Sequence, residues 1–323
     1  MVAWLRAGHR PDIVYAVGVN CIWGFAFVVP KYVAPDADPT IMALGRYVVY
    51  GLLSAAILLA ARRAVGLTRI RWLRAFAYAF IGHVGYYVVL VWAISRGGVM
   101  VVAPIMATLP VSVAMVGNLL DKDLDFKRLI SPLLVSGTGI AVLRMYQNRQ
   151  TALDGGQVMS MMSGALLALG ALSMWTAYAV LNARYLRRTQ VSSVVWSQAM
   201  GLCCLLQAVV AILLGLSFPW QPAPLLPWAE SQEAAARFGV GVLVLGVVVS
   251  WFSTQVWNKV SRNLPITVTG QLLVVQSLAA IAYASWFDRC LPKPIEMACV
   301  AVIILGVVWG VRVAYKVSGS SRP

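Results

Sequence analysis

Apolar residues along this chain gather into ten long runs that are separated by short polar breaks. Each run is about as long as the helical stretch that crosses the hydrocarbon core of a bilayer, roughly 20 residues at 1.5 Å per residue. The pattern therefore predicts an all-α integral membrane protein with ten transmembrane helices. The expected spans are 12–32, 39–61, 72–94, 99–120, 127–144, 157–183, 191–216, 236–258, 265–287 and 294–314.

The polar breaks differ in charge from one side of the predicted membrane to the other. When the N-terminus is placed in the cytoplasm, most of the 26 Lys and Arg residues fall in cytoplasmic breaks. This bias marks orientation, so we expect both termini to be cytoplasmic. Arg6 and Arg10 precede the first run, and no clear A-x-A cleavage site follows it, so we interpret it as an uncleaved span and not as a signal peptide.

The composition supports a multi-pass membrane protein, because 60% of the residues are hydrophobic and only 11% are charged. We expect it to lie in the cell inner membrane. The net charge of +15 is spread over the breaks instead of forming one patch, which argues against nucleic-acid binding. The five cysteines form neither a CxxC metal pair nor an extracellular disulfide framework, and no P-loop occurs. We expect no metal, no cofactor and no use of ATP.

The first and sixth spans are related by a spacing of 152 residues, as an internal repeat would require. This spacing also places Arg46 opposite Gln198. The identical pairs are Ala16 with Ala168, Gly18 with Gly170, Trp23 with Trp175 and Val28 with Val180.

Later spans add to the evidence for a repeat. Ser95-Arg96 begins the fourth span and Ser261-Arg262 stands at the start of the ninth; Asp123 and Asp288 lie thirteen residues beyond Pro110 and Val275. Five spans per half is an odd number, so the two halves must cross the membrane in opposite senses. We expect a five plus five inverted repeat of residues 1–150 and 151–323, a common plan among secondary transporters.

These features resemble the drug/metabolite transporter superfamily, and in particular chains with two EamA-type five-helix repeats. The family pattern is matched by Trp23-Gly24 in the first span, Trp175 in the sixth, and Pro110 followed by Asp123 in the fourth; Val275 replaces the second proline. The resemblance implies a central cavity lined by inner helices of both halves, with the fifth and tenth helices outside it. Bacterial exporters of aromatic amino acids are the nearest comparison.

Polar and aromatic residues recur at helical spacing on several spans, where they would share a face. A transporter needs such stripes, because a partly polar metabolite must exchange water for side-chain hydrogen bonds inside hydrocarbon. The alternative is that they serve helix packing and interhelical hydrogen bonding. The stripes are Asn20, Trp23, Phe27 and Lys31; His83, Tyr86 and Tyr87; Trp175, Tyr178 and Asn182; and Thr267 with Gln271.

Arg46 is the charged residue placed deepest in a predicted span. It lies about 10 Å from the outer surface, given seven residues at 1.5 Å each. An unpaired charge at this depth costs free energy, so its presence suggests a specific role. A guanidinium suits a substrate carboxylate or phosphate. The alternative is that its long side chain extends to the outer face or caps a broken helix.

His83 lies near the middle of the third span, where it would serve either as a proton carrier or as a neutral hydrogen-bonding group. None of the eleven acidic residues reaches mid-membrane, which argues against a carboxylate proton relay.

Pro104 and Pro110 are expected to interrupt the fourth helix and supply a gating kink. Gly306 and Gly310 form a GxxxG face suited to close helix contact, including a homodimer.

Together these observations predict a secondary transporter that exports small amphipathic metabolites, in the first place amino acids or their derivatives, by alternating access between two repeats. Its partners would be that substrate and the bilayer. Gln198 and Gln271 would join Asn20 and Arg46 in orienting polar groups. An exporter of lipophilic drugs is the alternative. A membrane-embedded lipid enzyme is disfavoured, because His9 and His83 are the only histidines and no catalytic cluster is visible.

Overall fold

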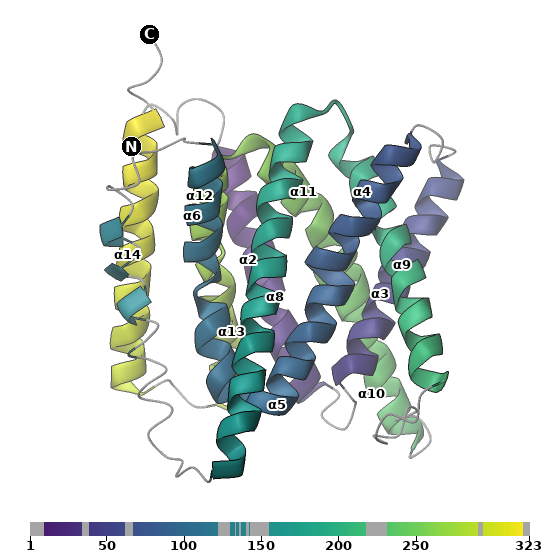
Figure 1. Cartoon of the computed structure of the whole chain (residues 1–323), viewed down its shortest axis with the longest axis horizontal. Helices are drawn as coiled ribbons and strands as arrows, with labels where there is room; N and C mark the ends of the chain where they lie inside the picture. Colours follow the sequence, from purple (N-terminus) through teal and green to yellow (C-terminus); the bar gives the residue numbers. More distant parts are fainter. Residues whose placement is uncertain are drawn as a thin grey trace.

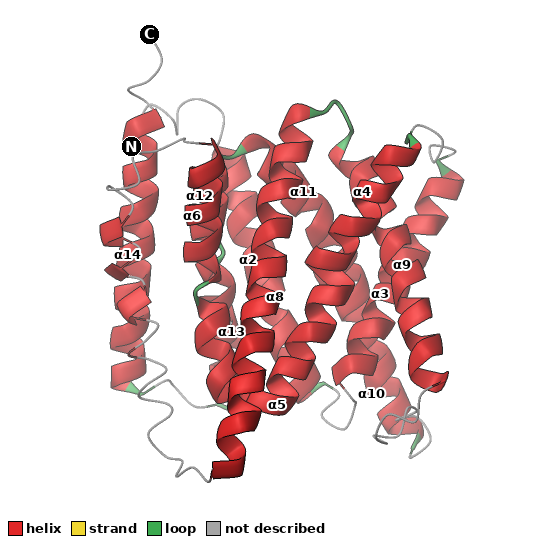
Figure 2. Cartoon of the chain, in the orientation of Figure 1, coloured by secondary structure: helices red, strands yellow, loops and turns green. Residues whose placement is uncertain are grey.

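Helices make up all the regular structure that is described in this computed structural model (Figure 2). The described residues are 10–33, 39–61, 67–121, 130–132, 134–135, 137–139, 142, 155–217, 231–289 and 293–318. Figure 1 shows the helices side by side, running between the upper and lower edges of the molecule. The all-helical prediction is confirmed for this part of the chain.

Five of the predicted spans correspond to single helices, and their bounds match the expected ranges closely. They begin and end within a few residues of the apolar runs, since the runs set where a helix can be buried in hydrocarbon. These helices are α2 (Arg10–Tyr32), α3 (Pro39–Ala60), α8 (Gly155–Arg188), α9 (Ser193–Ser217) and α14 (Pro294–Ser318).

The other described spans are divided. The third consists of α4 (Arg69–Ala79), the π-helix η2 (Phe80–Val84) and the start of α5 (Gly85–Ala107), and the fourth of the rest of α5 and α6 (Leu109–Asp121). The eighth consists of α10 (Gln232–Leu243), η4 (Val244–Phe252), which is also a π-helix, and α11 (Ser253–Asn263). The ninth consists of α12 (Ile266–Leu272) and α13 (Val274–Phe287).

Six helical runs in the described part are long and apolar enough to cross a membrane, judged by length and composition. The fifth predicted span is described only at scattered positions, all of them helical. Gly139 in that span lies against Cys299 and Ile303 of α14, which stands at one edge of the bundle (Figure 1). The number of ten helices and the orientation of the termini therefore stay predictions.

The third and fourth predicted spans are joined without a break in helical structure, which the sequence did not predict. In Figure 1, α4 and α6 lie toward the upper edge and α5 is labelled at the lower edge, so the chain reverses direction along α5. Gly97 is buried there against Gly164 of α8, and a side chain on Gly164 would overlap the backbone of Gly97. Small residues thus allow α5 and α8 to approach closely.

Helix interruptions occur at matching positions in the two halves. The helix breaks at Thr108, two residues before Pro110, and again at Leu273, two residues before Val275. Proline lacks the N–H needed to continue the hydrogen-bond ladder, but the second break has no proline. There the Leu273 N–H donates to the Gly270 carbonyl at 3.2 Å instead. Pro104 lies inside α5, where the backbone is helical; its side chain is outside the described residues.

The π-helices also fall at matching positions. The spacing of 165 residues that relates Pro110 to Val275 relates Phe80–Val84 to residues 245–249, which lie inside η4. π-helical turns widen the helix and are frequent at functional sites. They leave no clear signal in an apolar run, so the sequence did not predict them.

Helices of the first half pack mainly against helices of the second. α2 packs against α13 and α11, and α8 correspondingly against α5, α6 and η2. α3 packs against α9, and α6 against α12. The main hydrophobic core accordingly contains residues of both halves, so side chains at its centre come from both.

The contact between α3 and α9 depends on two glycines. A side chain on Gly51 would lie 2.8 Å from the Gly201 carbonyl oxygen, and one on Gly201 would overlap the Ser54 hydroxyl and lie 2.9 Å from the Tyr50 ring. Gly215, on the same helix as Gly201, has open space around it.

We expect Gly201→Ala to destabilise the protein by about 1–3 kcal/mol, because overpacking forces the two helices apart. The measurement is the thermal unfolding midpoint of the purified protein in detergent. Gly215→Ala is the matched control and should leave the midpoint unchanged or slightly raised, since alanine favours helix. Equal midpoints for both variants would contradict the close contact.

Candidate functional site

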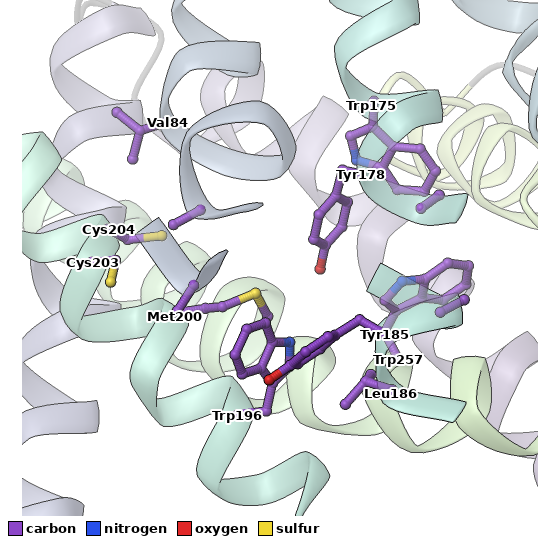
Figure 3. Close-up of a cluster of buried hydrophobic side chains, with 14 of the residues drawn as sticks. Val84, Trp175, Tyr178, Tyr185, Leu186, Trp196, Met200, Cys203, Cys204 and Trp257 are labelled. Carbon is purple, nitrogen blue, oxygen red and sulfur yellow. The ribbon is translucent and has the colours of Figure 1, made fainter. Parts of the chain in front are cut away.

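Three tryptophans from three helices meet in the core of the molecule. Trp23 of α2 lies 6.1 Å from Trp175 of α8 and 5.0 Å from Trp257 of α11, measured between ring centroids, and the last two are 6.0 Å apart. Figure 3 shows Trp175 and Trp257 with Tyr178 beside them. The sequence predicted Trp23 and Trp175 through the repeat. It did not predict Trp257, although the spacing of 165 residues that relates Pro110 to Val275 pairs it with Trp92.

A hydrogen bond ties this cluster to the π-helix of the eighth span. The Trp23 indole N–H donates to the Val249 carbonyl in η4 at 3.2 Å. By contrast, the Trp257 indole N–H is buried without a hydrogen-bond partner among the described residues. A buried donor of this kind costs free energy unless something accepts from it.

His83 lies in η2 and is surrounded by tyrosine rings. Its ring centroid is 5.2 Å from that of Tyr178, 6.1 Å from Tyr47 and 6.2 Å from Tyr50. The Tyr178 ring can approach because Gly82 has no side chain to obstruct it. The Nε2 atom of His83 is buried and makes no hydrogen bond to the described residues.

Arg46 lies beside this histidine cluster, on α3. Its guanidinium is 4.7 Å from the Tyr47 ring centroid and 5.1 Å from that of Tyr87, and it donates to the Tyr47 hydroxyl at 3.1 Å. Its buried Nε has no partner, and Arg46 forms no ion pair within the described residues. Aromatic faces stabilise a cation only partly, so the Arg46 guanidinium is still able to bind an anionic ligand.

The predicted amide residues are buried, but no hydrogen bond joins them to Arg46 among the described residues. Gln198 accepts from the Trp251 indole at 3.0 Å, and Asn20 donates to its own helix, to Ala16, at 2.7 Å. Both amide atoms of Gln271 lack a partner in the described part of the chain, and its side chain is 3% exposed. Gln271 is thus the amide most in need of a further partner.

A second polar cluster was not predicted as a unit. Asn182 donates to Asn258 at 2.7 Å and accepts from the Trp196 indole at 2.8 Å, and Asn258 donates to the Ser197 hydroxyl at 2.7 Å. These residues lie on α8, α9 and α11. The signal available in the sequence was polar residues at matching depth in three spans, which does not reveal which of them pair.

The structure therefore joins most predicted residues into one continuous path. Contacts run from Trp23 and Trp175 through Tyr178 and His83 to Tyr47 and Arg46. Tyr87 contacts Arg46, and Tyr86 packs against the same core. The Phe27 and Lys31 side chains lie outside the described residues.

Comparisons with known proteins bear on this arrangement. Residues 11–145 match the sequence model of the EamA-like transporter family. The chain is 29% identical over 316 residues to the inner membrane protein YtfF of Escherichia coli (strain K12), which covers 93% of this chain and 94% of that protein. A crystal structure of another protein aligns with a TM-score of 0.74 and 14% identity, over 95% of this chain and 98% of that one. This last likeness shows the fold.

These matches support the superfamily predicted from the sequence and a role in transport. With the long apolar helices they show a multi-pass protein of the inner membrane, so the predicted localisation is confirmed. The closer comparison with aromatic amino-acid exporters stays a prediction.

Proposed function

We propose that this chain is a secondary transporter of the EamA type that exports small amphipathic metabolites bearing an anionic group, in the first place amino acids or their derivatives. Transport would proceed by alternating access through a path between the two repeats. Both termini would lie in the cytoplasm, as the distribution of basic residues indicates.

The internal repeat is part of this proposal. Residues 1–150 and 151–323 would form two inverted five-helix units with the substrate site between them near the membrane midplane. Support comes from the paired helix breaks at Thr108 and Leu273 and from the paired π-helices η2 and η4. The packing of α2 on α13 is matched by that of α8 on α6, and the packing of α2 on α11 by that of α8 on α5, which fits the same two-fold relation.

The observation that carries the proposal is the Arg46 cation, which has aromatic neighbours but no carboxylate partner among the described residues. A charge in a membrane interior is expensive and marks a functional site unless another role explains it. Its fork of N–H donors suits a carboxylate. The tryptophan cluster at the other end of the aromatic path offers stacking surface for the apolar part of the same ligand.

Uptake into proteoliposomes of a labelled panel tests this function. The panel should contain neutral, aromatic and acidic amino acids, an N-acylated derivative and a lipophilic cation, with protein-free liposomes as the control. We expect uptake of one carboxylate-bearing class and no uptake of the cation, because Arg46 repels it. Uptake of the cation alone would favour a drug exporter of the same fold.

The same measurement with and without a pH gradient tests His83 as a proton carrier. Uptake that follows the gradient, and loses this dependence in His83→Gln, would support the role. Uptake indifferent to the gradient would favour exchange or uniport.

A further inference from the structure

Helix α11 is bounded at both ends by backbone that is not α-helical. The π-helix η4 precedes Ser253, and after Asn263 the chain becomes extended at Leu264, with φ −101° and ψ 149°. The eleven residues of α11 are therefore a rigid segment between two places where the helical hydrogen-bond ladder changes or stops. Such places are where helices bend.

Four of the six buried residues of α11 are polar, the other two being Trp257 and Val260, and so many buried polar side chains are unusual for a helix inside a membrane protein. Ser253, Thr254, Asn258 and Ser261 are each 2% exposed or less. Asn258 joins α11 to α8 through Asn182 and to α9 through Ser197, each at 2.7 Å. A further hydrogen bond runs from the Ser197 hydroxyl to the Ser193 carbonyl at the start of α9.

More polar contacts hold the last turn of α11. The Asn263 amide donates to the Asp12 carboxylate of α2 at 3.1 Å, and the Lys259 ammonium lies 4.6 Å from the Tyr15 ring centroid. Arg262 donates to the Val191 carbonyl in the connection between α8 and α9. α11 is thus fastened to α2, α8 and α9 by side-chain hydrogen bonds and a cation–π contact.

The other end of the same span is packed differently. There α10 lies against α3 through apolar side chains, with Val242 against Gly45 and Met42 against Gly241. An apolar seal loses hydrophobic stabilisation when it opens to water. A hydrogen-bonded contact loses less, because water replaces the broken bonds and each is worth only about 1 kcal/mol net. The end formed by α11 is the one built to open and close reversibly.

The same helix carries Trp257, which is 1% exposed and closes the group formed by Trp23 and Trp175. Its unpartnered indole N–H lies in this group. Movement of α11 would withdraw one of the three indoles and separate Asn258 from Asn182 and Ser197 at once.

We propose that α11 is the cytoplasmic gate of the transport cycle, latched by Asn182, Asn258 and Ser197, and that Trp257 forms a wall of the substrate site only while the gate is shut. The proposal rests on the transport function given above. The indole N–H of Trp257 donates to a polar atom of the bound substrate. Substrate binding and closure of the gate then favour one another, because each stabilises the position of α11 that the other requires.

Cysteine accessibility tests the gate without any knowledge of the substrate. Ser261→Cys is placed in a background with the five native cysteines replaced, and a membrane-impermeant maleimide is added to the cytoplasmic face of inverted vesicles. Asn258→Ala is expected to raise the labelling rate about tenfold, because two latch hydrogen bonds are lost. Asn182→Ala breaks the same latch from the facing helix and should act in the same direction.

Tyr50→Phe is the matched control. It removes a hydrogen bond of the same length, 2.7 Å, to the same residue, Ser197, but from α3 and not from α11, so labelling should not change. Ala43→Cys, 2% exposed near the other end of the bundle, should show no rise from the outer face. If size-exclusion chromatography shows both latch variants to be folded and labelling at Ser261→Cys is unchanged in both, the proposal that α11 is the gate is wrong.

The role of Trp257 has a separate readout. Trp257→Phe should raise KM for the transported substrate about tenfold, through loss of the indole hydrogen bond and part of the stacking surface, while labelling at Ser261→Cys stays unchanged. An unaltered KM would contradict the proposed contact between Trp257 and the substrate. It would not affect the role proposed for the hydrogen bonds of Asn182, Asn258 and Ser197. If the panel shows no uptake but the latch variants still raise labelling at Ser261→Cys, the substrate class proposed above fails and the movement of α11 stands.

Discussion

Arg46→Ala is expected to reduce uptake of a carboxylate-bearing substrate about 100-fold, because truncating one partner of a buried charge pair typically costs a few kcal/mol. The guanidinium is held over Tyr47 and Tyr87 and has no counter-charge of its own among the described residues. Its removal should leave the tyrosines packed and the protein inserted. The measurement is initial uptake in proteoliposomes, with protein amount and unfolding midpoint matched to the unsubstituted protein.

Two further variants make this prediction sharper. Arg46→Lys keeps the charge but loses the planar fork and the stacking on tyrosine, so uptake should fall to an intermediate level. Arg237→Ala is the control on a surface arginine, because Arg237 pairs with Glu233 at 3.6 Å on the exposed side of α10. Its uptake should stay within about twofold, as expected for an exposed pair. Equal uptake by Arg46→Ala and the unsubstituted protein would show that Arg46 extends away from the substrate.

Trp175→Ala is the second change with a large expected effect. The Trp175 indole contacts Trp23, Trp257 and Tyr178 and is 8% exposed. Its truncation should destabilise the protein by about 3–5 kcal/mol, as for large-to-small changes at aromatic core positions. Where enough folded protein remains, KM should rise about tenfold through loss of a stacking partner. Thermal unfolding and uptake measure the two effects separately.

Trp286→Ala is the control for this change. Trp286 is 82% exposed at the end of α13, so its loss should alter neither the unfolding midpoint nor KM by much. Trp175→Phe separates packing from binding, since phenylalanine fills most of the volume. A large fall in stability with KM unaltered in both Trp175 variants would assign Trp175 to packing alone.

The sequence predicted the helices that correspond to single apolar runs, because run length is set directly by bilayer thickness. It failed where a helix changes geometry within a run. Nothing in Ala79-Phe80-Ile81 or Leu243-Val244 signals a π-helix, since apolar residues are compatible with either helical form. The continuity of α5 was also missed, because the predicted spans 72–94 and 99–120 leave a gap that contains Gly97, and Gly97 is helical and packs against Gly164 of α8.

The candidate site was predictable to the extent that the repeat identified it. Trp23 and Trp175 stand out because they occupy matching positions, and Arg46 because it is charged. The pairing of Asn182 with Asn258 joins residues 76 positions apart, and no local pattern specifies such a partner. The repeat does offer a signal for Trp257, because the spacing of 165 residues pairs it with Trp92, but its contacts with Trp23 and Trp175 come from two other helices and only the structure shows them.

The π-helix η4 also determines which way α11 faces. An α-helix turns the chain by about 100° per residue, and a π-helix turns it by less because its hydrogen bonds span one residue more. A helical wheel drawn through the whole eighth span as one α-helix would therefore assign Asn258 and Trp257 to the wrong side. The direction in which these side chains point is set by the number of residues in η4 that precede them, so an insertion or deletion there would re-aim α11 without changing any residue in it.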